Sequence, residues 1–163
     1  MDTVTLRALQ APLKQRYRDA PESAFVTTHA EGHPDEGISC VVKTWGGDTV
    51  AGLHPATGGD GTKACSADML LEALVACAGV TLNSVATALG VTLKNAVVRA
   101  RGKWDARGTL GVDKTAAVGL TEIELSFDIG NDTDEQTKAK LVELTERYCV
   151  IYQTLRSPPR LGR

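Results

Sequence analysis

The chain has 163 residues, which suits one domain of ordinary size that can bury a core without disulfide or metal support. Its net charge of -2 and its aromatic content of 4% give no reason to expect nucleic acid as a partner, because such partners select basic surfaces and stacking platforms. The N-terminus has an early acid, Asp2, and no apolar core segment, so it does not resemble a secretory signal. We therefore expect a cytoplasmic location in which cysteines stay reduced.

The N-terminal third is predicted to hold one helix and several short strands. Residues 1–22 form an N-terminal helical segment, because apolar residues recur at helical spacing over residues 6–19, with a kink or restart at Pro12. The core then extends over residues 23–157. It begins with a strand over residues 23–30 and a turn over residues 31–37. Residues 38–43 alternate between apolar and polar, which indicates a half-buried strand, and a hairpin leads into a strand over residues 49–53.

A long helix is predicted over residues 66–89, with Ser66 as its cap and Gly90 as its stop. Apolar side chains surround most of this helix, so we expect it to be buried on most sides and to form the central core element. A membrane span is disfavoured, because polar residues such as Thr81 and Asn83 interrupt the segment and its alanines and glycines add little transfer free energy.

Two amphipathic strands follow, over residues 96–104 and 123–129. Their outer faces are basic and acidic respectively, so the two strands would pair well across a ladder. Thr133 and Gln136 make a capping box for a last helix, whose apolar stripe runs without interruption to Leu155. The order of strands, helix, strands and helix predicts a single α+β domain over residues 1–163, with antiparallel sheets around the long buried helix.

Neither the histidines nor the glycine-rich loop indicates a bound group. His29 and His33 flank a turn with no second ligand pair after them, so a metal is not expected. The loop over residues 54–63 has glycines and Lys63 but lacks the spacing of a phosphate-binding loop, so we interpret it as a connector.

The four cysteines are the main candidates for chemistry. They lack C-x-x-C spacing, and Cys40 falls on the apolar side of its strand as an inert core thiol. Cys65 lies just before the start of a helix, whose positive end favours a thiolate. Cys77 lies inside the helix and needs a cation from elsewhere in the fold. From the residues alone, Cys77 and Cys149 are better explained as buried packing residues of their helices than as reactive thiols.

Two segments resemble a known family. The segment CSADMLLEALVACAGVTLNSVATALGV, Cys65–Val91, resembles the central-helix signature of the OsmC/Ohr family, and LTERYCVIYQTL, Leu144–Leu155, resembles its second-cysteine helix. Cys149 lies 72 residues after Cys77, close to the separation in that family. The order of elements agrees over about residues 23–157, and the loop AGLHPATGGDG indicates an OsmC-like branch.

The resemblance implies a fold and an activity. The OsmC-like fold is an intertwined homodimer, with central helices packed in the core and active sites at the subunit interface. Typical members reduce organic hydroperoxides in a stress response. Cys77 would attack the peroxide as a thiolate and Cys149 would resolve the resulting sulfenic acid as a disulfide. A dithiol or lipoyl protein would then reduce the disulfide. The resemblance implies no metal and no bound organic cofactor.

The sequence departs from the family pattern at two positions. The family carries a glutamate ten residues before the first cysteine, where it holds an arginine beside the thiolate, and that position here is Ala67. Arg16 and Arg18 are the candidates for the activating cation. Cys149 is followed by Val150, where the family often has proline.

Two alternatives to this assignment stay open. In the leading hypothesis, Met69, Leu70 and Leu74 line a pocket for an apolar peroxide tail. The first alternative is a catalytically silent homodimer of the same fold that binds a small hydrophobic ligand, and the missing glutamate at Ala67 favours it. In the second alternative, Cys65 is the nucleophile and pairs with Cys77.

Overall fold

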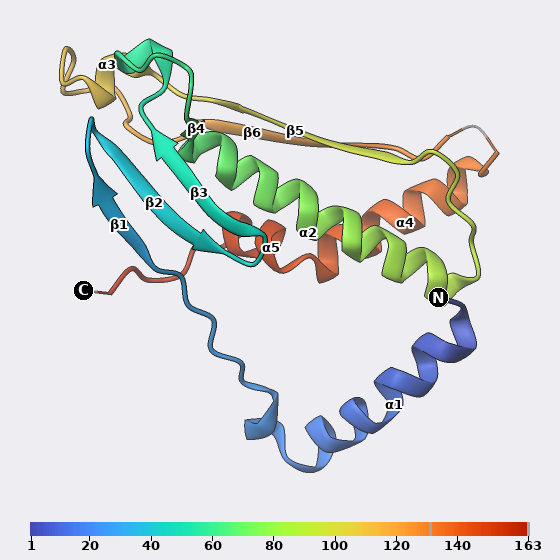
Figure 1. The fold of residues 1–163 in the computed structure, drawn as a ribbon. Coiled ribbons are helices and arrows are strands. Elements are labelled where there is room, and N and C mark those ends of the chain that lie inside the picture. Colours follow the sequence, from blue (N-terminus) through green and yellow to red (C-terminus); the bar gives the residue numbers. More distant parts are fainter. Residues whose placement is uncertain (131, 163) are drawn as a thin grey trace. The chain divides into compact units, whose positions relative to one another are not determined.

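The computed structural model describes residues 1–130 and 132–162 (Figure 1). Its internal contacts divide the chain into two units. Unit 1 comprises Met1–Thr27, Leu74–Arg99 and Ser126–Arg163, and unit 2 comprises Thr28–Ala73 and Ala100–Leu125. Asn131 and Arg163, part of the domain expected over residues 1–163, lie outside the described residues. Helices and strands both contribute, so the chain belongs to the predicted α+β class.

A four-stranded sheet is the main element of unit 2. It consists of β1 (Gly32–Asp35), β2 (Ser39–Thr44), β3 (Gly47–Gly52) and β4 (Ala64–Cys65), in that order. The β1–β2 and β2–β3 pairs are antiparallel, whereas the two-residue β4 runs parallel to β3 with Gly52 opposite Cys65. The strands predicted over residues 38–43 and 49–53 are therefore confirmed.

The prediction for residues 23–37 is wrong. A short 3-10 helix, η1 (Pro21–Ala24), replaces the start of the expected strand, and Phe25 is exposed. Residues 32–35 pair with β2 although they were expected to be a turn. The turn lies instead at Gly37 and Ile38, which both have positive φ. Pro34 is tolerated because β1 is an edge strand of the sheet.

Helix α1 (Thr3–Asp19) forms the predicted N-terminal helical segment. Asp2 caps it by accepting a hydrogen bond of 2.7 Å from the Thr5 N–H. The helix continues through Pro12 without a restart, and the kink expected as the other possibility stays a prediction. Among residues 3–19 no side chain is buried, so the tertiary packing of α1 is slight.

Helix α2 (Ser66–Leu89) has the predicted bounds. It buries one stripe of side chains, namely Leu74, Ala78, Leu82, Val85 and Ala86. Other apolar positions are open, and Val80 is 72% exposed. Within one chain the helix is therefore buried on one face, and not on most sides as its composition suggested.

By length and composition alone, α2 could cross a membrane, with a mean hydropathy of 1.7 in its most apolar window. The core helix of a soluble protein passes the same test. The polar residues along α2 and its contribution to a buried cluster favour a core helix.

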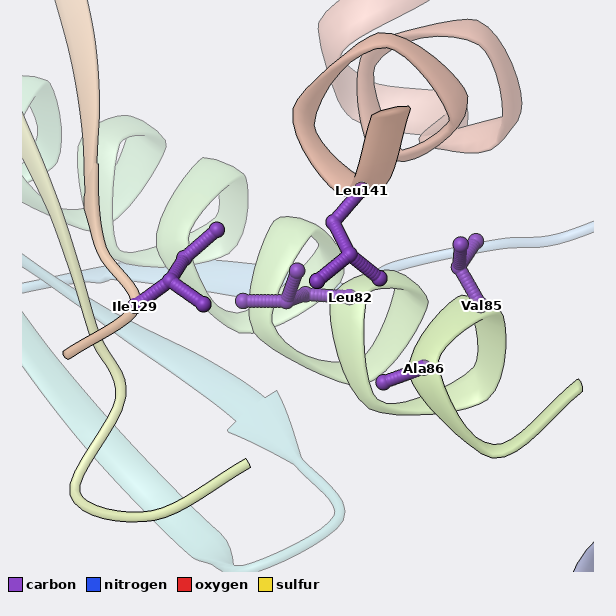
Figure 2. Close-up of a cluster of buried hydrophobic side chains, with 5 residues drawn as sticks. All are labelled: Leu82, Val85, Ala86, Ile129 and Leu141. Atoms are coloured by element: carbon purple, nitrogen blue, oxygen red, sulfur yellow. The ribbon is translucent and has the colours of Figure 1, made fainter. Parts of the chain in front are cut away.

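The core of unit 1 forms where α2 meets the C-terminal elements (Figure 2). In Figure 2, Leu141 of α4 (Glu135–Tyr148) points toward Leu82 of α2, and so does Ile129, the residue that follows β6 (Glu122–Asp128). Val85 and Ala86 extend the cluster by one turn of α2. Burial of these side chains fixes the rotation of α2, and hence the side of it on which Cys77 lies.

Strands β5 (Val97–Lys103) and β6 (Glu122–Asp128) pair as predicted, and a one-turn helix α3 (Ala106–Thr109) lies between them in the sequence. In unit 2, Lys103 forms an ion pair of 2.7 Å with Glu122, and Arg101 pairs with Glu124. These exposed pairs confirm the expected basic and acidic faces, although each contributes little free energy in water.

The last helix differs from the prediction at both its start and its middle. Asp134, and not Thr133, caps α4 by accepting from the Thr137 N–H at 2.9 Å. The helix ends at Tyr148, Cys149 is extended, and a second helix, α5 (Val150–Arg156), follows. This interruption positions the candidate site.

Candidate functional site

Helix α2 carries Cys77 beside its buried stripe, next to Ala78 and one turn after Leu74. The Cys77 side chain is partly buried. One turn further on, the Thr81 hydroxyl donates a hydrogen bond of 2.8 Å to the Cys77 carbonyl oxygen. Because α2 is long and anchored by its buried stripe, the Cys77 sulfur is held on a rigid element.

Cys149 occupies the interruption between α4 and α5. Its N–H donates to the Thr145 carbonyl at 2.9 Å, as the last bond of α4, and its backbone is then extended with φ of −74° and ψ of 111°. Its Sγ accepts a hydrogen bond from the Tyr152 N–H at 3.4 Å and so caps α5. The side chain is fully buried, with 0% exposure.

The side chain of Gln153 stabilises this interruption. In a continuous helix the Glu146 carbonyl would accept from the Val150 N–H. Here it accepts instead from Gln153 Nε2 at 2.8 Å. The carbonyl of Glu146 is therefore satisfied, and the Val150 N–H is released from its usual helical bond.

The structure brings Cys77 and Cys149 together within unit 1. Each thiol shifts the pKa of the other, and the amides of Val150 and Ile151 also lower the pKa of Cys77. Two sulfurs that are far apart in the sequence thus lie close to each other near the start of α5. Such contact is what direct disulfide formation requires.

The two thiols differ in acidity. Burial raises the pKa of Cys77, but hydrogen bonds from the Ile151 amide, the Cys149 thiol, the Val150 amide and the Thr81 hydroxyl lower it by more. The net pKa of Cys77 is below its ordinary value. Since a thiolate and not a thiol is the nucleophile, Cys77 is the better attacking group.

Cys149 shifts in the opposite direction. Burial is the main cause that raises its pKa, and the neighbouring Cys77 sulfur raises it further, while the Tyr152 amide offsets part of the effect. Cys149 therefore stays protonated while Cys77 ionises. A low-pKa sulfur in contact with a protonated second sulfur suits a reaction in which the first is oxidised and the second closes a disulfide.

The arginines expected beside Cys77 have partners within α1. Arg16 lies over the Tyr17 ring, with its guanidinium carbon 5.1 Å from the ring centroid, and Arg18 donates to Gln15 Oε1 at 2.8 Å. Both are exposed. In the described part of the chain, the groups that lower the pKa of Cys77 are hydrogen-bond donors and not guanidinium groups.

Unit 2 contains an apolar cavity of about 330 Å3. Leu70 lines it, together with Leu53, Trp104, Val118 and Leu120. Of the other two residues expected in such a pocket, Leu74 is in unit 1 and only 1% exposed, and Met69 is not part of the lining. The His54 ring meets the Trp104 ring edge to face at 5.3 Å.

Cys65 lies in β4 and also lines this cavity, and Ala67, the position of the family glutamate, lies beside it. Cys65 belongs to unit 2, whereas Cys77 belongs to unit 1, so the alternative in which these two cysteines pair stays a prediction. Cys40 is partly buried in β2.

Within residues 1–130 and 132–162, no group of three or more His, Cys, Asp or Glu side chains is arranged to hold a metal ion. The described site itself consists of the sulfurs of Cys77 and Cys149 and the groups that shift their pKa values.

Sequence reasoning missed Gln153 and the two backbone N–H groups that follow Cys149. No glycine or proline marks the interruption, because the segment around Cys149 reads Tyr-Cys-Val-Ile. The one available signal was the resemblance of residues 144–155 to a second-cysteine helix, and it located the cysteine but not the break.

Comparisons with known proteins agree with this fold. The family model described as OsmC-like protein matches residues 59–162. The OsmC-like protein from Mycoplasma pneumoniae has a TM-score of 0.68 at 20% identity, over 82% of this chain and 89% of that chain. The organic hydroperoxide resistance protein OsmC from Legionella pneumophila has a TM-score of 0.64 at 19% identity, over 82% and 92%. The organic hydroperoxide resistance protein OhrB of Bacillus subtilis has a TM-score of 0.57 at 16% identity, over 80% and 93%. No curated protein matches the sequence.

The long helix α2 carries one cysteine, and a second cysteine follows α4. This arrangement and the structural similarity define a protein of the OsmC/Ohr fold. Because the family model covers more than half of the sequence, the chain belongs to the OsmC-like family.

Proposed function

We propose that the protein reduces organic hydroperoxides, with Cys77 as the peroxidatic residue and Cys149 as the resolving residue. The observation that carries this proposal is the contact between two thiols whose pKa values shift in opposite directions. Membership of the OsmC-like family supports it, as do structural neighbours named as hydroperoxide resistance proteins.

The first step is nucleophilic attack on the peroxide. The Cys77 thiolate bonds to the terminal oxygen of ROOH, the O–O bond breaks, and the leaving alkoxide takes a proton to become ROH. The sulfur is oxidised to a sulfenic acid as the peroxide is reduced. The lowered pKa of Cys77 favours the thiolate before the attack.

The second step closes a disulfide. The Cys149 sulfur attacks the Cys77 sulfenic acid, the S–O bond breaks, and the oxygen leaves as water with the thiol proton. A dithiol or a lipoyl protein then reduces the disulfide by thiol–disulfide exchange and is itself oxidised. Because Cys149 is fully buried, this reductant needs a local opening of the α4–α5 junction to reach the sulfur.

The experiment is a peroxidase assay with cumene hydroperoxide and a dithiol reductant. Cys77→Ser is expected to abolish turnover, and Cys149→Ser is expected to leave a Cys77 sulfenic acid that dimedone traps. Cys40→Ser is the matched control for loss of a partly buried thiol outside the site. Full activity in Cys77→Ser would overturn the proposal.

The roles of Arg16 and Arg18 remain predictions. Each side chain is exposed and contacts another residue of α1. A role at Cys77 therefore requires a rearrangement of α1 or a contribution from a second copy of the chain. Replacement of each by Lys and by Ala separates a charge effect from an effect of the guanidinium. If neither Ala variant changes the rate of Cys77 alkylation, these arginines do not activate the thiol.

We also propose a homodimer in the cytoplasm. The observation that favours a dimer is the apolar surface that one chain leaves open on α2, including Val80. A second copy would cover this surface. Sedimentation or light scattering tests the oligomeric state, and Val80→Glu is expected to shift it toward monomer.

A second candidate function is a catalytically silent homodimer that binds a small hydrophobic ligand. The cavity of about 330 Å3 in unit 2 favours it, since the volume and apolar lining suit a small molecule. Trp104 lines the cavity and Trp45 is exposed, so Trp45→Phe leaves a single fluorescent reporter. Saturable quenching by a small aromatic ligand, without peroxidase turnover, would favour this function.

A further inference from the structure

We propose that the reductant enters the protein through a hollow at the α4–α5 junction and attacks the sulfur of Cys149. The inference rests on the proposed disulfide between Cys77 and Cys149. It adds the place at which this disulfide is reduced, the sulfur that is attacked and the chemistry of the group that the hollow binds.

The hollow lies within unit 1, where α4 ends and α5 begins, and its volume is about 460 Å3. Arg147 and Tyr148 line it from the end of α4, and Thr154 lines it from α5. Cys149 also belongs to the lining, although its side chain is 0% exposed. The hollow therefore reaches this residue without opening its sulfur to solvent.

A hydrogen bond holds the Cys149 sulfur in its covered position. The Tyr152 N–H donates to Sγ at 3.4 Å, so the sulfur caps the first turn of α5. A helix of seven residues depends on its cap and on tertiary contacts. A disulfide requires its own torsion angles around Sγ, so oxidation draws the sulfur out of this cap. The start of α5 then loosens, and the hollow opens toward the bond that must be reduced.

The rim of the hollow indicates what it binds. The Arg147 guanidinium carbon lies 5.5 Å from the centroid of the Tyr148 ring, and Tyr148 is 59% exposed. An exposed aromatic ring packs well against an apolar chain, and a guanidinium donates to a carbonyl or carboxylate oxygen. The hollow therefore fits a dithiol on an apolar chain that ends in an amide or a carboxylate, as in a lipoyl group.

The step is a thiol–disulfide exchange. A thiolate of the reductant bonds to Cys149 Sγ, the Cys77–Cys149 bond breaks, and Cys77 leaves as a thiolate. The second thiol of the reductant then attacks the mixed disulfide, and Cys149 leaves and takes a proton. The reductant becomes a cyclic disulfide, and its two electrons reduce the disulfide of the protein.

Attack at Cys149 also releases the better leaving group. In this exchange, the thiol with the lower pKa leaves faster. The pKa of Cys77 is lowered and that of Cys149 is raised. Release of Cys77 is therefore favoured, in agreement with the position of the hollow.

The first measurement starts from protein oxidised with diamide and follows the reduction of its disulfide by dihydrolipoamide, with acid quenching and mass spectrometry. Thr154→Trp fills the hollow from an exposed position on α5 and is expected to slow this reduction about tenfold, because the reductant can no longer be positioned at the sulfur. Arg156→Trp is the matched control, because Arg156 is exposed on the same helix and does not line the hollow. Equal rates in the two variants would overturn the proposal.

Arg147→Gln tests the assignment of the rim and separates the two sources of such a dithiol. We expect reduction by dihydrolipoic acid and by dihydrolipoamide to slow about tenfold relative to reduction by dithiothreitol, which has no chain, as for the loss of a hydrogen bond to a charged group. Slowing with the acid alone would assign the hollow to a free carboxylate, and slowing with both would assign it to an amide-linked arm as well. An unchanged ratio for both reductants would overturn the assignment.

A second measurement needs no substitution and covers the case in which Thr154→Trp does not fold. The oxidised protein is exposed briefly to β-mercaptoethanol, a monothiol that stays on the sulfur it attacks. We expect the adduct on the Cys149 peptide, and an adduct on the Cys77 peptide would overturn the proposal. Failure of diamide to link the two cysteines would also overturn it. Absence of peroxidase turnover, with these results intact, would contradict only the proposed function.

Discussion

Gln153 Nε2 donates a hydrogen bond of 2.8 Å to the Glu146 carbonyl, across the residue at which the C-terminal helix is interrupted. A side chain of α5 thereby replaces the backbone donor that α4 lacks at this point. The replacement matters because the displaced donor, the Val150 amide, is one of the groups that lower the pKa of Cys77. The acidity of a cysteine on α2 is therefore expected to depend on a hydrogen bond that involves neither α2 nor a charged group.

Gln153→Met tests this dependence. Loss of the donor leaves a partly buried carbonyl unsatisfied, which is expected to lower the free energy of unfolding by about 1–3 kcal/mol. The Val150 N–H can then return toward Glu146, so the alkylation profile of Cys77 should move to higher pH. Denaturant unfolding and peptide-resolved alkylation measure the two effects.

The matched control for that variant is Gln136→Met, an exposed glutamine of α4 away from the interruption. It is expected to change neither quantity appreciably. If Gln153→Met lowers stability but leaves the Cys77 profile where it was, Gln153 has a structural role only.

Replacement of Cys149 by Ser or by Ala separates its hydrogen bonds from its redox chemistry. Both variants lose the disulfide. A serine hydroxyl can still accept from the Tyr152 N–H and donate to Cys77, whereas alanine can do neither. Cys149→Ala is expected to be about 1 kcal/mol less stable than Cys149→Ser, because it removes the cap of α5.

The same pair of variants has a second readout at Cys77. Because the Cys149 thiol is one of the groups that lower the pKa of Cys77, the thiolate should be less favoured in Cys149→Ala than in Cys149→Ser. Thiolate absorbance during a pH titration measures the difference. Identical Cys77 titrations in the two variants would show that the contact between the sulfurs does not tune acidity.

The depressed pKa of Cys77 predicts how stability depends on pH. Below the ordinary thiol pKa of 9.0, the unfolded state keeps the Cys77 proton while the folded state releases it, so the unfolded state binds more protons. Stability from this group therefore increases as pH rises through the folded pKa of Cys77, is fully present above pH 9.0, and is lost as pH falls.

The stability difference between the unmodified protein and Cys77→Ser should accordingly grow between pH 7 and pH 9 under reducing conditions. Cys149 has the opposite sign: its raised pKa contributes stability that is present below its ordinary pKa and is lost as pH rises through the folded value. Urea unfolding at several pH values measures the difference. A difference that stays constant or shrinks over this range would contradict the prediction.

Local sequence signals were sufficient for α2 but not for the C-terminal helix. The bounds of α2 agree with the prediction because Ser66 and Gly90 mark its ends and apolar residues continue between them. The interruption at Cys149 has no comparable mark, since Leu144, Tyr148 and Ile151 keep helical spacing across it. It is accompanied by the bond from the Gln153 side chain to the Glu146 carbonyl, which helix propensity does not contain.

The candidate site was accordingly predicted in part. The resemblance selected Cys77 and Cys149, and the structure brings them into contact. The donors to Cys77 could not be predicted, because a backbone N–H has no residue-type signature and becomes available only where a helix is interrupted. At Pro34, in the same way, strand pairing overrode a residue that usually indicates a turn.

The glycine loop of unit 2 provides the last prediction. A Cβ at Gly59 would lie 1.8 Å from the Leu53 carbonyl oxygen, which is backbone and cannot move aside as a flexible side chain can. Gly59→Ala must therefore displace the segment that holds Leu53 and His54, two residues of the cavity wall. We expect the free energy of unfolding to fall by about 1–3 kcal/mol, as for other overpacked sites, together with a changed environment at Trp104.

Gly46→Ala is the control, because its Cβ would meet only Thr44 Oγ1 at 4.0 Å. Trp104 fluorescence during urea unfolding, in the Trp45→Phe background, compares the two variants. Equal midpoints and equal spectra would show that the loop around Gly59 adapts without affecting the cavity.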